Sequence, residues 1–551
     1  MLSIAAIHVI ITLVCIITGR LFYRIISDNS EKPFLYQALT GLIVLTTVSQ
    51  VAALFLPVNH IFSAAVIGVV LLIAFIRKRD VLRFRFMPRP VTFVLFAAAA
   101  WLVVLFFSAG PVMMDDTESY HIQMVKWIYE YGTVPGIANL HERFGFNSSW
   151  FSSVSFFLAG AGEHNFFTSL NGLLSLWFCI HVGGIIVKAG PDRENSILVK
   201  TGALVMLVLA FLSWPVLRGN AATTNYDFIT ALVIVTLFTG ILMNRNDNKG
   251  LPVEWLLWPV FLLTVRITNF PILLLPLYAL VTGTVNRRQL WMYAGLSILL
   301  VAPFLARNIM LSGYPVFPSM FVDVFRVDWK VDPAVNRDLL TYIKYYNRVN
   351  YMFQDMEVTR EIPFPQWTFY WFRYLFTYDK LVLVPGILGI IVSLFRLRHL
   401  KTFSSVLPFF VTVLLAQLLT WFVVAPDPRF VYGPLLCGAF LLPMVIPYAG
   451  ALQKLWRTPI VFMLLSLALL GYAGVKFIKT PPVQNFMLPV KLPQPPLDTL
   501  RIDGLRLHIP HRILDNWNPR CYATPLPCLY KVDARLRARG DAISDGFRIQ
   551  K

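Results

Sequence analysis

The chain has 551 residues, of which 57% are hydrophobic and only 14% are charged. Its mean hydropathy of +0.64 lies well above the range of ordinary soluble domains, which excludes a soluble enzyme or binding protein. The formal net charge of +19 does not indicate nucleic acid, because the cations mostly lie in short segments between apolar stretches, where they set membrane orientation. Membrane lipids with anionic headgroups are the expected partners of these cations.

Apolar stretches long enough to cross a hydrocarbon layer recur along the chain, divided by polar or basic residues. We expect about fourteen membrane spans. They lie near residues 4–22, 36–56, 60–77, 91–109, 165–187, 197–217, 227–243, 253–266, 268–283, 289–307, 380–396, 404–424, 429–449 and 458–476. The expected fold is therefore an all-α polytopic membrane protein with a transmembrane domain over residues 1–476.

Basic residues predict how the spans are oriented. The first cations, Arg20 and Arg24, follow the first apolar stretch, so we expect the N-terminus to face outward. The run from Arg77 to Arg89 and the other short basic loops then lie inside. Three longer segments lie on the opposite side, at residues 110–164, 308–379 and 477–551, and functional residues are expected there.

Residues 253–283 are the exception in this map. Two segments of about 14–16 residues are short for full spans, and they surround Arg266 and Asn269. We expect a broken or re-entrant hairpin, whose backbone must be sheltered by protein or water. Arg266 is a candidate functional residue because charges at membrane depth are costly; snorkelling of its side chain from a short hairpin is the alternative.

Two adjacent carboxylates, Asp115 and Asp116, begin the first external segment. The apolar spacing from Thr117 to Tyr131 predicts an amphipathic helix along the membrane surface, ending at Gly132. The two carboxylates would then lie at the mouth of a cavity between spans, where one can act as general base for an acceptor hydroxyl. Capping of the helix N-terminus is the alternative role.

Glu118 and His121 lie one turn apart on the same predicted helix. They could bind substrate or ligate a divalent cation, whereas an ordinary surface pair with a structural hydrogen bond is the alternative. No Walker lysine loop, nucleotide-binding glycine pattern or HExxH helix occurs in a suitable context, so ATP-driven transport and zinc peptidase chemistry lose support.

Further substrate-binding candidates lie near the outer ends of spans. Arg307 precedes a turn that contains Tyr314, and its guanidinium suits the oxygens of a lipid-linked phosphate. Asp427 and Arg429 share a short external turn, where they either pair with each other or face the same cavity. Arg143, in the first external segment, completes this set of candidates.

The five cysteines fall into two groups. Cys15, Cys179 and Cys437 lie within predicted spans and are expected to pack as small apolar residues. Cys521 and Cys528 lie seven residues apart in the external tail, where an oxidising compartment permits a disulfide. Two free thiols are the alternative.

The segments DDTESYHIQMVKWIYEYG, ARNIMLSGYPVFPS, APDPRF and CYATPLPC, together with DGFRI, resemble the GT-C superfamily of integral membrane glycosyltransferases. The resemblance is to a poorly characterised bacterial branch, similar to mannosyltransferases and arabinosyltransferases. It implies a GT-C fold and sugar transfer from a polyprenyl-phosphate carrier to a glycan, lipid or protein acceptor. The expected location is the periplasmic or exterior face of the bacterial inner membrane.

The resemblance also implies roles for individual residues. It gives Asp115 or Asp116, with a preference for Asp116, the role of activating the acceptor. The chemistry of transfer also needs positive charge near the departing phosphate, which Arg307, Arg429 or Arg266 could supply. If one carboxylate acts only as base, a single displacement inverts the anomeric centre. The acidic segment here follows the fourth predicted span, whereas the superfamily commonly places it after the first.

Two other functions fit the same pattern. A secondary transporter or flippase of lipid-linked or polar substrates would also have many spans, a broken hairpin and an intramembrane arginine. An O-antigen ligase or polymerase would use lipid-linked sugars with a different arrangement of loops. The long external segments favour a transferase, because they provide surface to hold an acceptor.

Overall fold

A computed structural model describes residues 1–26, 32–77, 89–162, 166–188, 194–243, 252–282, 287–349, 360–445, 456–479, 489–513 and 519–550. Helices form most of this part of the chain, and the only named strands within it belong to two small antiparallel pairs in the tail. The basic run from Lys78 to Arg85, used above to predict orientation, lies outside the described residues.

Nine helical segments of the described chain are long and apolar enough to cross a membrane. They are α1 (Leu2–Ile25), α2 (Phe34–Ala52), α4 (Val91–Ala109), α7 (Leu170–Lys188), α13 (Arg287–Ser312), α17 (Thr377–Phe395), α19 (Leu407–Val424), the run Pro428–Val445 with α20 (Tyr432–Val445), and α22 (Thr458–Lys479). Shorter apolar helices are α3 (His60–Arg77), α8 (Glu194–Leu212), α10 (Asp227–Met243), α11 (Glu254–Val265) and the run Ile267–Val281, which comprises η5 (Ile267–Leu273) and α12 (Leu274–Val281). The predicted helical membrane protein is thus confirmed, while the number of spans stays a prediction.

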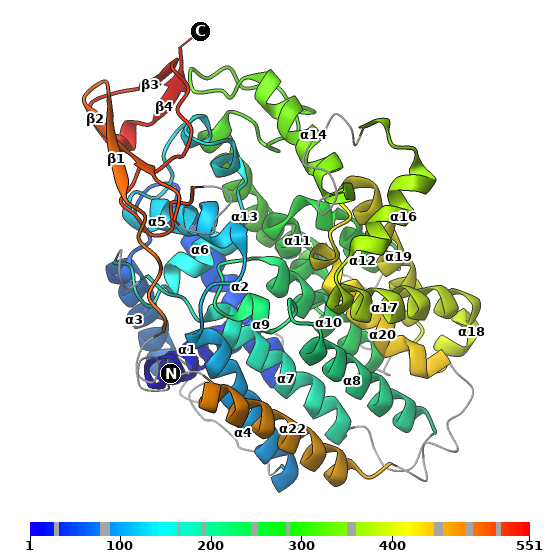
Figure 1. The fold of residues 1–551 in the computed structure, drawn as a ribbon. Coiled ribbons are helices and arrows are strands. Elements are labelled where there is room, and N and C mark those ends of the chain that lie inside the picture. The colour runs from blue at the N-terminus through cyan, green and yellow to red at the C-terminus, as the bar shows by residue number, and fades with distance from the viewer. Residues whose placement is uncertain are drawn as a thin grey trace.

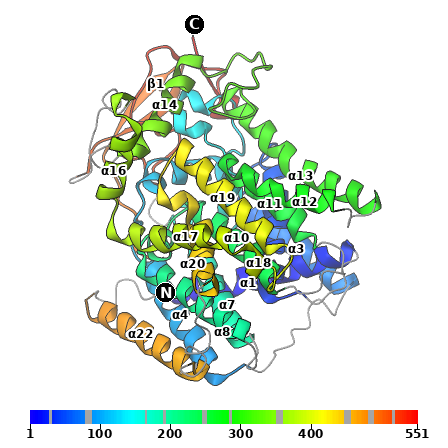
Figure 2. The same cartoon turned by 90° about the vertical axis from the view of Figure 1, so that its right-hand side faces the viewer.

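Small residues let several of these helices approach closely. A Cβ atom placed on Gly389 of α17 would collide with the backbone of Gly438 in α20, so neither position tolerates a larger side chain without movement. At one end of the molecule, Phe462 of α22 packs against Phe93 and Phe96 of α4, with ring centroids 5.5 and 5.4 Å apart. Figure 2 shows α22 and α4 at the end opposite β1 and α14.

The helix breaks at Arg266, within the segment for which a broken hairpin is predicted. Arg266 has extended backbone angles (φ −154°, ψ 123°) and lies between α11 and the 3₁₀ segment η5. The Asn269 side chain donates to the carbonyl of Leu262, 3.0 Å away, which helps to satisfy the backbone at the end of α11. Pro271 lies within η5 and lacks a backbone donor, so a regular α-helix is disfavoured at this point.

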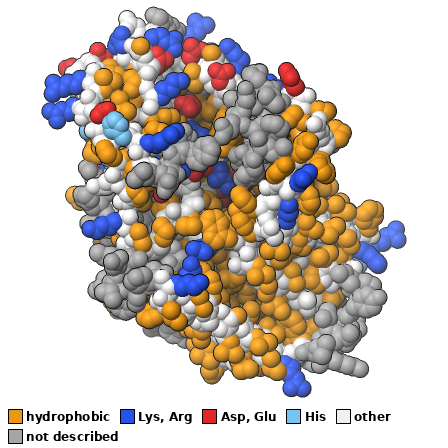
Figure 3. Space-filling model, in the orientation of Figure 1, with side chains coloured by type: hydrophobic (Ala, Val, Ile, Leu, Met, Phe, Trp, Pro, Cys, Tyr) orange, Lys and Arg blue, Asp and Glu red, His pale blue; other side chains and the backbone are white. Residues whose placement is uncertain are grey.

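Polar and apolar surfaces separate along the long axis of the molecule. In Figure 3, hydrophobic side chains cover much of the lower part of the face shown, and acidic and basic side chains gather toward the end that carries the tail. The elements at that end include α14 (Pro333–Val349) and the strands β1 (Leu497–Ile502), β2 (Leu505–Pro510), β3 (Leu536–Ala538) and β4 (Phe547–Ile549) (Figure 1). A protein that is partly embedded in lipid needs an apolar surface over the embedded part and a polar surface over the part in water.

Residues 110–164, which are predicted to form the first external segment, pack against the tail. This segment contains the π-helical turn η2 (Thr117–His121), the helix α5 (Ile122–Glu130), two 3₁₀ turns, η3 (Ile137–Asn139) and η4 (Glu142–Gly145), and α6 (Ser149–Phe156). The backbone amide of Phe547 in β4 donates to the carbonyl of Pro135, 3.0 Å away. The tail therefore packs on this segment and does not form an independent unit.

The predicted amphipathic helix is present as α5, but its polar face is buried. Gln123 and Lys126, on its polar face, are buried. Lys126 donates to the carbonyls of Ala523 and Thr524, both at 2.9 Å, and Gln123 donates to Tyr522 and Thr524. The polar face of this amphipathic helix therefore donates hydrogen bonds to backbone carbonyls of the tail, where water was expected.

Candidate functional site

A cavity of about 260 Å³ opens where the segments 110–164 and 308–379 meet the ends of the helices. Its charged lining consists of Asp116, Asp227, Arg143, Arg266 and Arg429, and its other lining side chains include Tyr120, His121, Asn147, Asn225, Tyr226, Phe304, Asn308, Phe317, Tyr342, Tyr346 and Phe430. These residues come from segments separated by as many as three hundred positions in the chain. Three guanidinium groups and two carboxylates thus line the cavity, and a third carboxylate, that of Asp427, lies beside Arg429 outside the lining.

Asp116 lies between two arginines. One carboxylate oxygen is 2.7 Å from Arg429 Nη2, and the other is 3.5 Å from Arg143 Nη1. Burial alone would raise the pKa of Asp116, but the charges of Arg429 and Arg143 outweigh burial and hold the pKa well below its usual range. Asp116 is therefore ionised at neutral pH.

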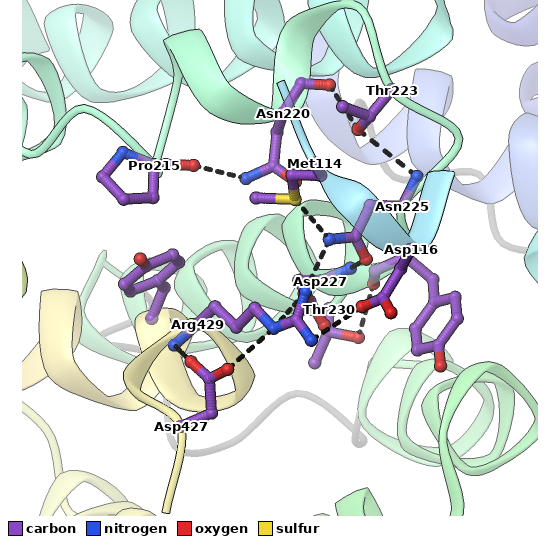
Figure 4. A network of polar contacts seen from close by, with 12 residues as sticks. Met114, Asp116, Pro215, Asn220, Thr223, Asn225, Asp227, Thr230, Asp427 and Arg429 are labelled. Atoms are coloured by element: carbon purple, nitrogen blue, oxygen red, sulfur yellow. Dashed lines mark hydrogen bonds and ion pairs between the residues drawn. The ribbon is translucent and has the colours of Figure 1, made fainter. Parts of the chain in front are cut away.

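Asp227 joins the two arginines of the inner part of the cavity. It begins α10, is almost fully buried, and has Oδ1 2.5 Å from Arg266 Nη2. Its other oxygen accepts from the Asn225 amide at 2.8 Å and lies 3.9 Å from Arg429 Nε. Figure 4 shows Asp227 at the centre of this network, with Asp116 and Arg429 beside it. The charge of Arg266 is thus compensated within the protein.

Arg429 is oriented by the turn that carries it. The Asp427 carboxylate accepts from the backbone amide of Arg429 at 3.1 Å and also lies 3.0 Å from its Nε atom (Figure 4). A short polar turn preceded by Asp is favoured because the side chain replaces a missing backbone acceptor. Asp427 thus pairs with Arg429, as one alternative predicts, and of the two residues only Arg429 lines the cavity.

The loop before α10 is fixed by amide side chains. Asn220 donates to the carbonyl of Pro215 at 2.6 Å, as Figure 4 shows, and Asn171 of α7 donates to the carbonyls of Thr223 and Asn225 at 3.0 and 2.7 Å. These side-chain amides supply donors to buried backbone carbonyls that accept no hydrogen bond within a helix or strand. They hold Asn225 and Asp227 in the wall of the cavity, between the short helix α9 (Arg218–Ala221) and α10.

His121 reaches the same cavity within an aromatic cluster. Its ring lies 4.4, 5.1 and 5.5 Å from the rings of Tyr120, Phe151 and Tyr226, measured between centroids. Burial lowers the pKa of His121 to about 3, so the imidazole is neutral at physiological pH. Neither ring nitrogen has a hydrogen-bond partner among the described residues, although both are buried. A neutral imidazole with two unsatisfied nitrogens in a cavity wall is suited to a ligand that both donates and accepts.

The structure separates the two carboxylates that the sequence presents as a pair. Asp115 is 61% exposed and lies 2.5 Å from Arg520 Nη2 of the tail, whereas only Asp116 lines the cavity. Glu118 also binds Arg520 and lies outside the cavity lining. Glu118 and His121 therefore have different surroundings, and a cation held by that pair is not favoured by their positions. Among the described residues, no group of three or more His, Cys, Asp or Glu side chains is placed to hold a metal ion.

Two other predicted substrate-binding residues do not line this cavity. Arg307 is fully buried in α13, and its Nη1 atom donates to the side-chain oxygen Oδ1 of Asn147 at 3.1 Å, so that it lies behind the cavity wall. Tyr314 packs in a separate hydrophobic cluster with Phe317 and donates to the carbonyl of Val331 at 3.2 Å. The turn around Tyr314 thus has a packing role.

Cys521 and Cys528 form a disulfide. The loop that it closes contains the carbonyls that Gln123 and Lys126 bind. Cys15, Cys179 and Cys437 are buried free thiols. The disulfide therefore belongs to the contact between the tail and the first external segment.

Sequence reasoning missed Asp227, Asn225, Tyr226 and Tyr342 as cavity residues. A signal for Asp227 was present, because an acidic residue at the very start of a predicted span needs a cationic partner at the same depth, and Arg266 was already expected there. No comparable signal identifies Tyr342, whose position depends on how α14 packs over the cavity.

Comparison with known proteins identifies a family for this chain but no named relative. Neither a curated protein nor a solved structure matches the chain. A family model with the description "Domain of unknown function (DUF8201)" matches residues 1–436, which contain every charged residue of the cavity. Because the match covers most of the sequence, this chain is a member of the DUF8201 family.

Proposed function

We propose that the protein is a GT-C-type glycosyltransferase, which moves a sugar from a polyprenyl-phosphate donor to an acceptor hydroxyl. The observation that carries the proposal is a cavity in which an ionised carboxylate, Asp116, lies beside two guanidinium groups, Arg143 and Arg429. Glycosyl transfer needs both features, because a base must accept a proton near the site where a phosphate departs with negative charge.

In the proposed step, the acceptor hydroxyl loses its proton to Asp116 while its oxygen attacks the anomeric carbon. The bond between that carbon and the phosphate oxygen breaks, and its electron pair leaves with the phosphate. Arg429 and Arg143 are placed to stabilise the charge that develops on the leaving group. One base and one displacement predict inversion at the anomeric carbon.

Donor binding would also make Asp116 a better base. In the structure, Arg429 holds the pKa of Asp116 below its usual range. A phosphate bound to Arg429 would compete for that guanidinium, weaken its contact with Asp116 and raise the pKa of the carboxyl group. The carboxylate would then accept a proton most readily when the donor is in place.

The apolar part of the lining suits the carrier. Phe304, Phe317, Pro318 and Val424 line the cavity next to its charged groups, and α13 and α19 supply apolar spans beside it. A polyprenyl chain needs apolar surface continuous with lipid. We place the reaction at the extracytoplasmic face of a bacterial inner membrane, since the cavity is built partly from segments for which the charge pattern predicts that side.

The test is reconstitution of the protein in liposomes with a pool of polyprenyl-phosphate sugars and candidate acceptors. We expect Asp116→Asn to reduce turnover by about 100-fold or more, the usual contribution of a general base. Asp115→Asn is the matched control, because its side chain points to Arg520, and it should retain nearly full turnover. Full activity of Asp116→Asn, with an unchanged thermal midpoint for both variants, would remove the assignment. NMR of the product gives the anomeric configuration, and retention would exclude a single displacement.

A transporter of a polar or lipid-linked substrate is the second candidate. The specific observation in its favour is the buried ion pair between Asp227 and Arg266, since charged pairs within a membrane domain also occur along transport pathways. The same liposomes separate the two functions. Movement of the labelled sugar lipid between leaflets without covalent transfer would favour transport over transfer.

A further inference from the structure

A second cavity of about 400 Å³ adjoins the first, and its lining residues lie outside the candidate membrane spans. Its walls come from three parts of the chain: the segment around η3 and η4, helix α14, and the tail between residues 530 and 549. Both cavities are lined by Arg143 and Tyr342, so these two side chains form the wall between them. The second cavity plays no part in the function described above.

The shared wall places the second cavity next to the reacting groups. Arg143 Nη1 lies 3.5 Å from the Asp116 carboxylate, and Nη2 donates to the Tyr342 hydroxyl at 3.3 Å. The Arg143 guanidinium also stacks over the Tyr342 ring, 5.6 Å from its centroid. A molecule held in the second cavity therefore needs to extend only past these two side chains to bring a hydroxyl to Asp116.

The charge of the second cavity differs from that of the first. Its lining contains the carboxylates of Glu142, Asp332, Asp338 and Asp533 against the cations Arg143, Lys531 and Arg535. Arg535 is held by Asp533 at 2.7 Å, and Arg143 is held by Asp116, so two of the three cations already have partners. Such a lining repels a polyanion and offers hydrogen-bond acceptors to hydroxyl groups.

Two aromatic rings complete the lining. Tyr342 stacks on Tyr346 with centroids 4.7 Å apart, which fixes the ring that faces both cavities. Tyr530 meets His141 edge-on at 4.7 Å and keeps 37% of its surface exposed. Fixed aromatic faces beside carboxylate acceptors match the alternating apolar and hydroxyl faces of a sugar ring.

We propose that the second cavity is the acceptor site and that the acceptor is a neutral saccharide. The choice of a saccharide follows from the lining, and its role as acceptor rests on the proposed transfer function. In this arrangement the first cavity, which is lined by three guanidinium groups, holds the phosphate of the donor, and the second cavity, which lacks a cationic excess, holds the hydroxyl-bearing partner. The tail supplies Tyr530 to this site and thereby contributes to the choice of acceptor.

Saturation-transfer NMR on the purified full chain tests binding without turnover. The probes are neutral tetrasaccharides of glucose, mannose and N-acetylglucosamine, with a tetragalacturonate as the anionic probe. We expect at least one neutral probe to bind, and the anionic probe to bind more weakly. Tyr530→Ala combined with Asp338→Asn should weaken binding by about tenfold, through loss of the aromatic face and of one hydrogen-bond acceptor. Asp541→Asn, an exposed tail position outside both cavities, should bind as the wild type does.

The outcomes separate this proposal from the one before it. Equal binding by wild type and the double variant, or binding of the anionic probe alone, would overturn the acceptor site and leave the transfer function standing. Binding that depends on Tyr530 and Asp338 in a protein that shows no sugar transfer would support a saccharide site and contradict the transferase. A thermal midpoint shared by all variants shows that any loss of binding is local.

Discussion

The charged side chains of the cavity pair with side chains of opposite charge. The carboxylates Asp116 and Asp227 each contact arginines that come from distant parts of the chain. Arg266 also lies over the Phe430 ring, 4.0 Å from its centroid, and over Tyr226 at 4.7 Å. Paired charges of this kind are costly to break and hold the polar side chains of the site in place before any ligand arrives.

The pair between Asp227 and Arg266 should therefore be strongly coupled. Asp227 is about 1% exposed, and replacement by Asn would leave the Arg266 guanidinium without its closest counter-charge. We expect Asp227→Asn to destabilise the fold by about 3–5 kcal/mol, as breaking a buried ion pair does. The double variant with Arg266→Gln should lose less than the sum of the two single variants. Thermal unfolding in detergent measures both effects, and additive losses would show that the pair is not coupled.

The acid sensitivity of the fold should depend on His121. The unperturbed pKa is 6.5, and burial lowers it to about 3 in the folded protein, so between these pH values the unfolded chain binds a proton that the folded chain does not. Stability is then lost as pH falls from about 6.5 toward 3, at up to about 1.4 kcal/mol per pH unit for this one group.

The variant His121→Phe removes this titration and should flatten the decline in thermal midpoint between pH 6.5 and pH 4. The exposed His511 of the tail provides a control, since His511→Phe removes an imidazole without touching the cavity. A wild-type decline that persists unchanged in His121→Phe would mean that other groups cause the acid sensitivity.

Among the elements, α5 and the disulfide loop of the tail depend on each other. Lys126 is buried and donates to two carbonyls of residues 523 and 524, and it also lies 3.5 Å from Glu130. The disulfide between Cys521 and Cys528 limits the conformations of the loop that presents these carbonyls. Because β4 also binds Pro135, the tail fixes the segment that leads from Asp116 into the second cavity.

We expect Lys126→Met to loosen this contact. The substitution keeps the apolar stem but leaves the buried Ala523 carbonyl without a donor, at a cost of about 1–3 kcal/mol. The Thr524 carbonyl keeps only its bond from Gln123. Limited proteolysis should then cleave the tail faster than in the wild type, and the thermal midpoint should fall. Lys491→Met, at an exposed position of the tail, is the matched control and should change neither. Equal protease resistance in both variants would show that α5 does not hold the tail.

At the scale of the whole molecule, α14 and the strands of the tail lie at one end, and the apolar helices extend away from it (Figures 1 and 2). Residues of α14 line both cavities. Charge patterning predicts that this end is outside the cell membrane and that short basic loops lie inside. The orientation can be tested directly, because the free cysteines of the wild-type chain are all buried.

A membrane-impermeant maleimide applied to intact cells should label Asp541→Cys in the tail and leave Lys401→Cys unlabelled until the cells are opened. Both positions are exposed in the structure, so access from one side of the membrane decides the result. For a Gram-negative host, the outer membrane must first be permeabilised. Labelling of both variants in intact cells, or of Lys401→Cys alone, would contradict the predicted orientation.

The amino-acid sequence by itself determined the features that depend on local composition. Each predicted apolar stretch contains a helix. An apolar segment of this length enters lipid, where it must form its backbone hydrogen bonds internally, and a helix does so. The break at Arg266 was also predictable, since two short apolar segments surround a charge and a proline follows. The position of Asp116 just after a long apolar helix, α4, was predictable for the same reason.

Only the tertiary structure decided which of these residues meet. Asp115 and Asp116 are equivalent in local sequence, yet the docked tail draws Asp115 to Arg520 while Arg429 and Arg143 hold Asp116 in the cavity. The partnership of Asp227 with Arg266 and the wall shared by the two cavities likewise depend on packing between segments far apart in the chain. Hydropathy and charge patterns report the surroundings of a residue along the chain, whereas a site forms from neighbours in space.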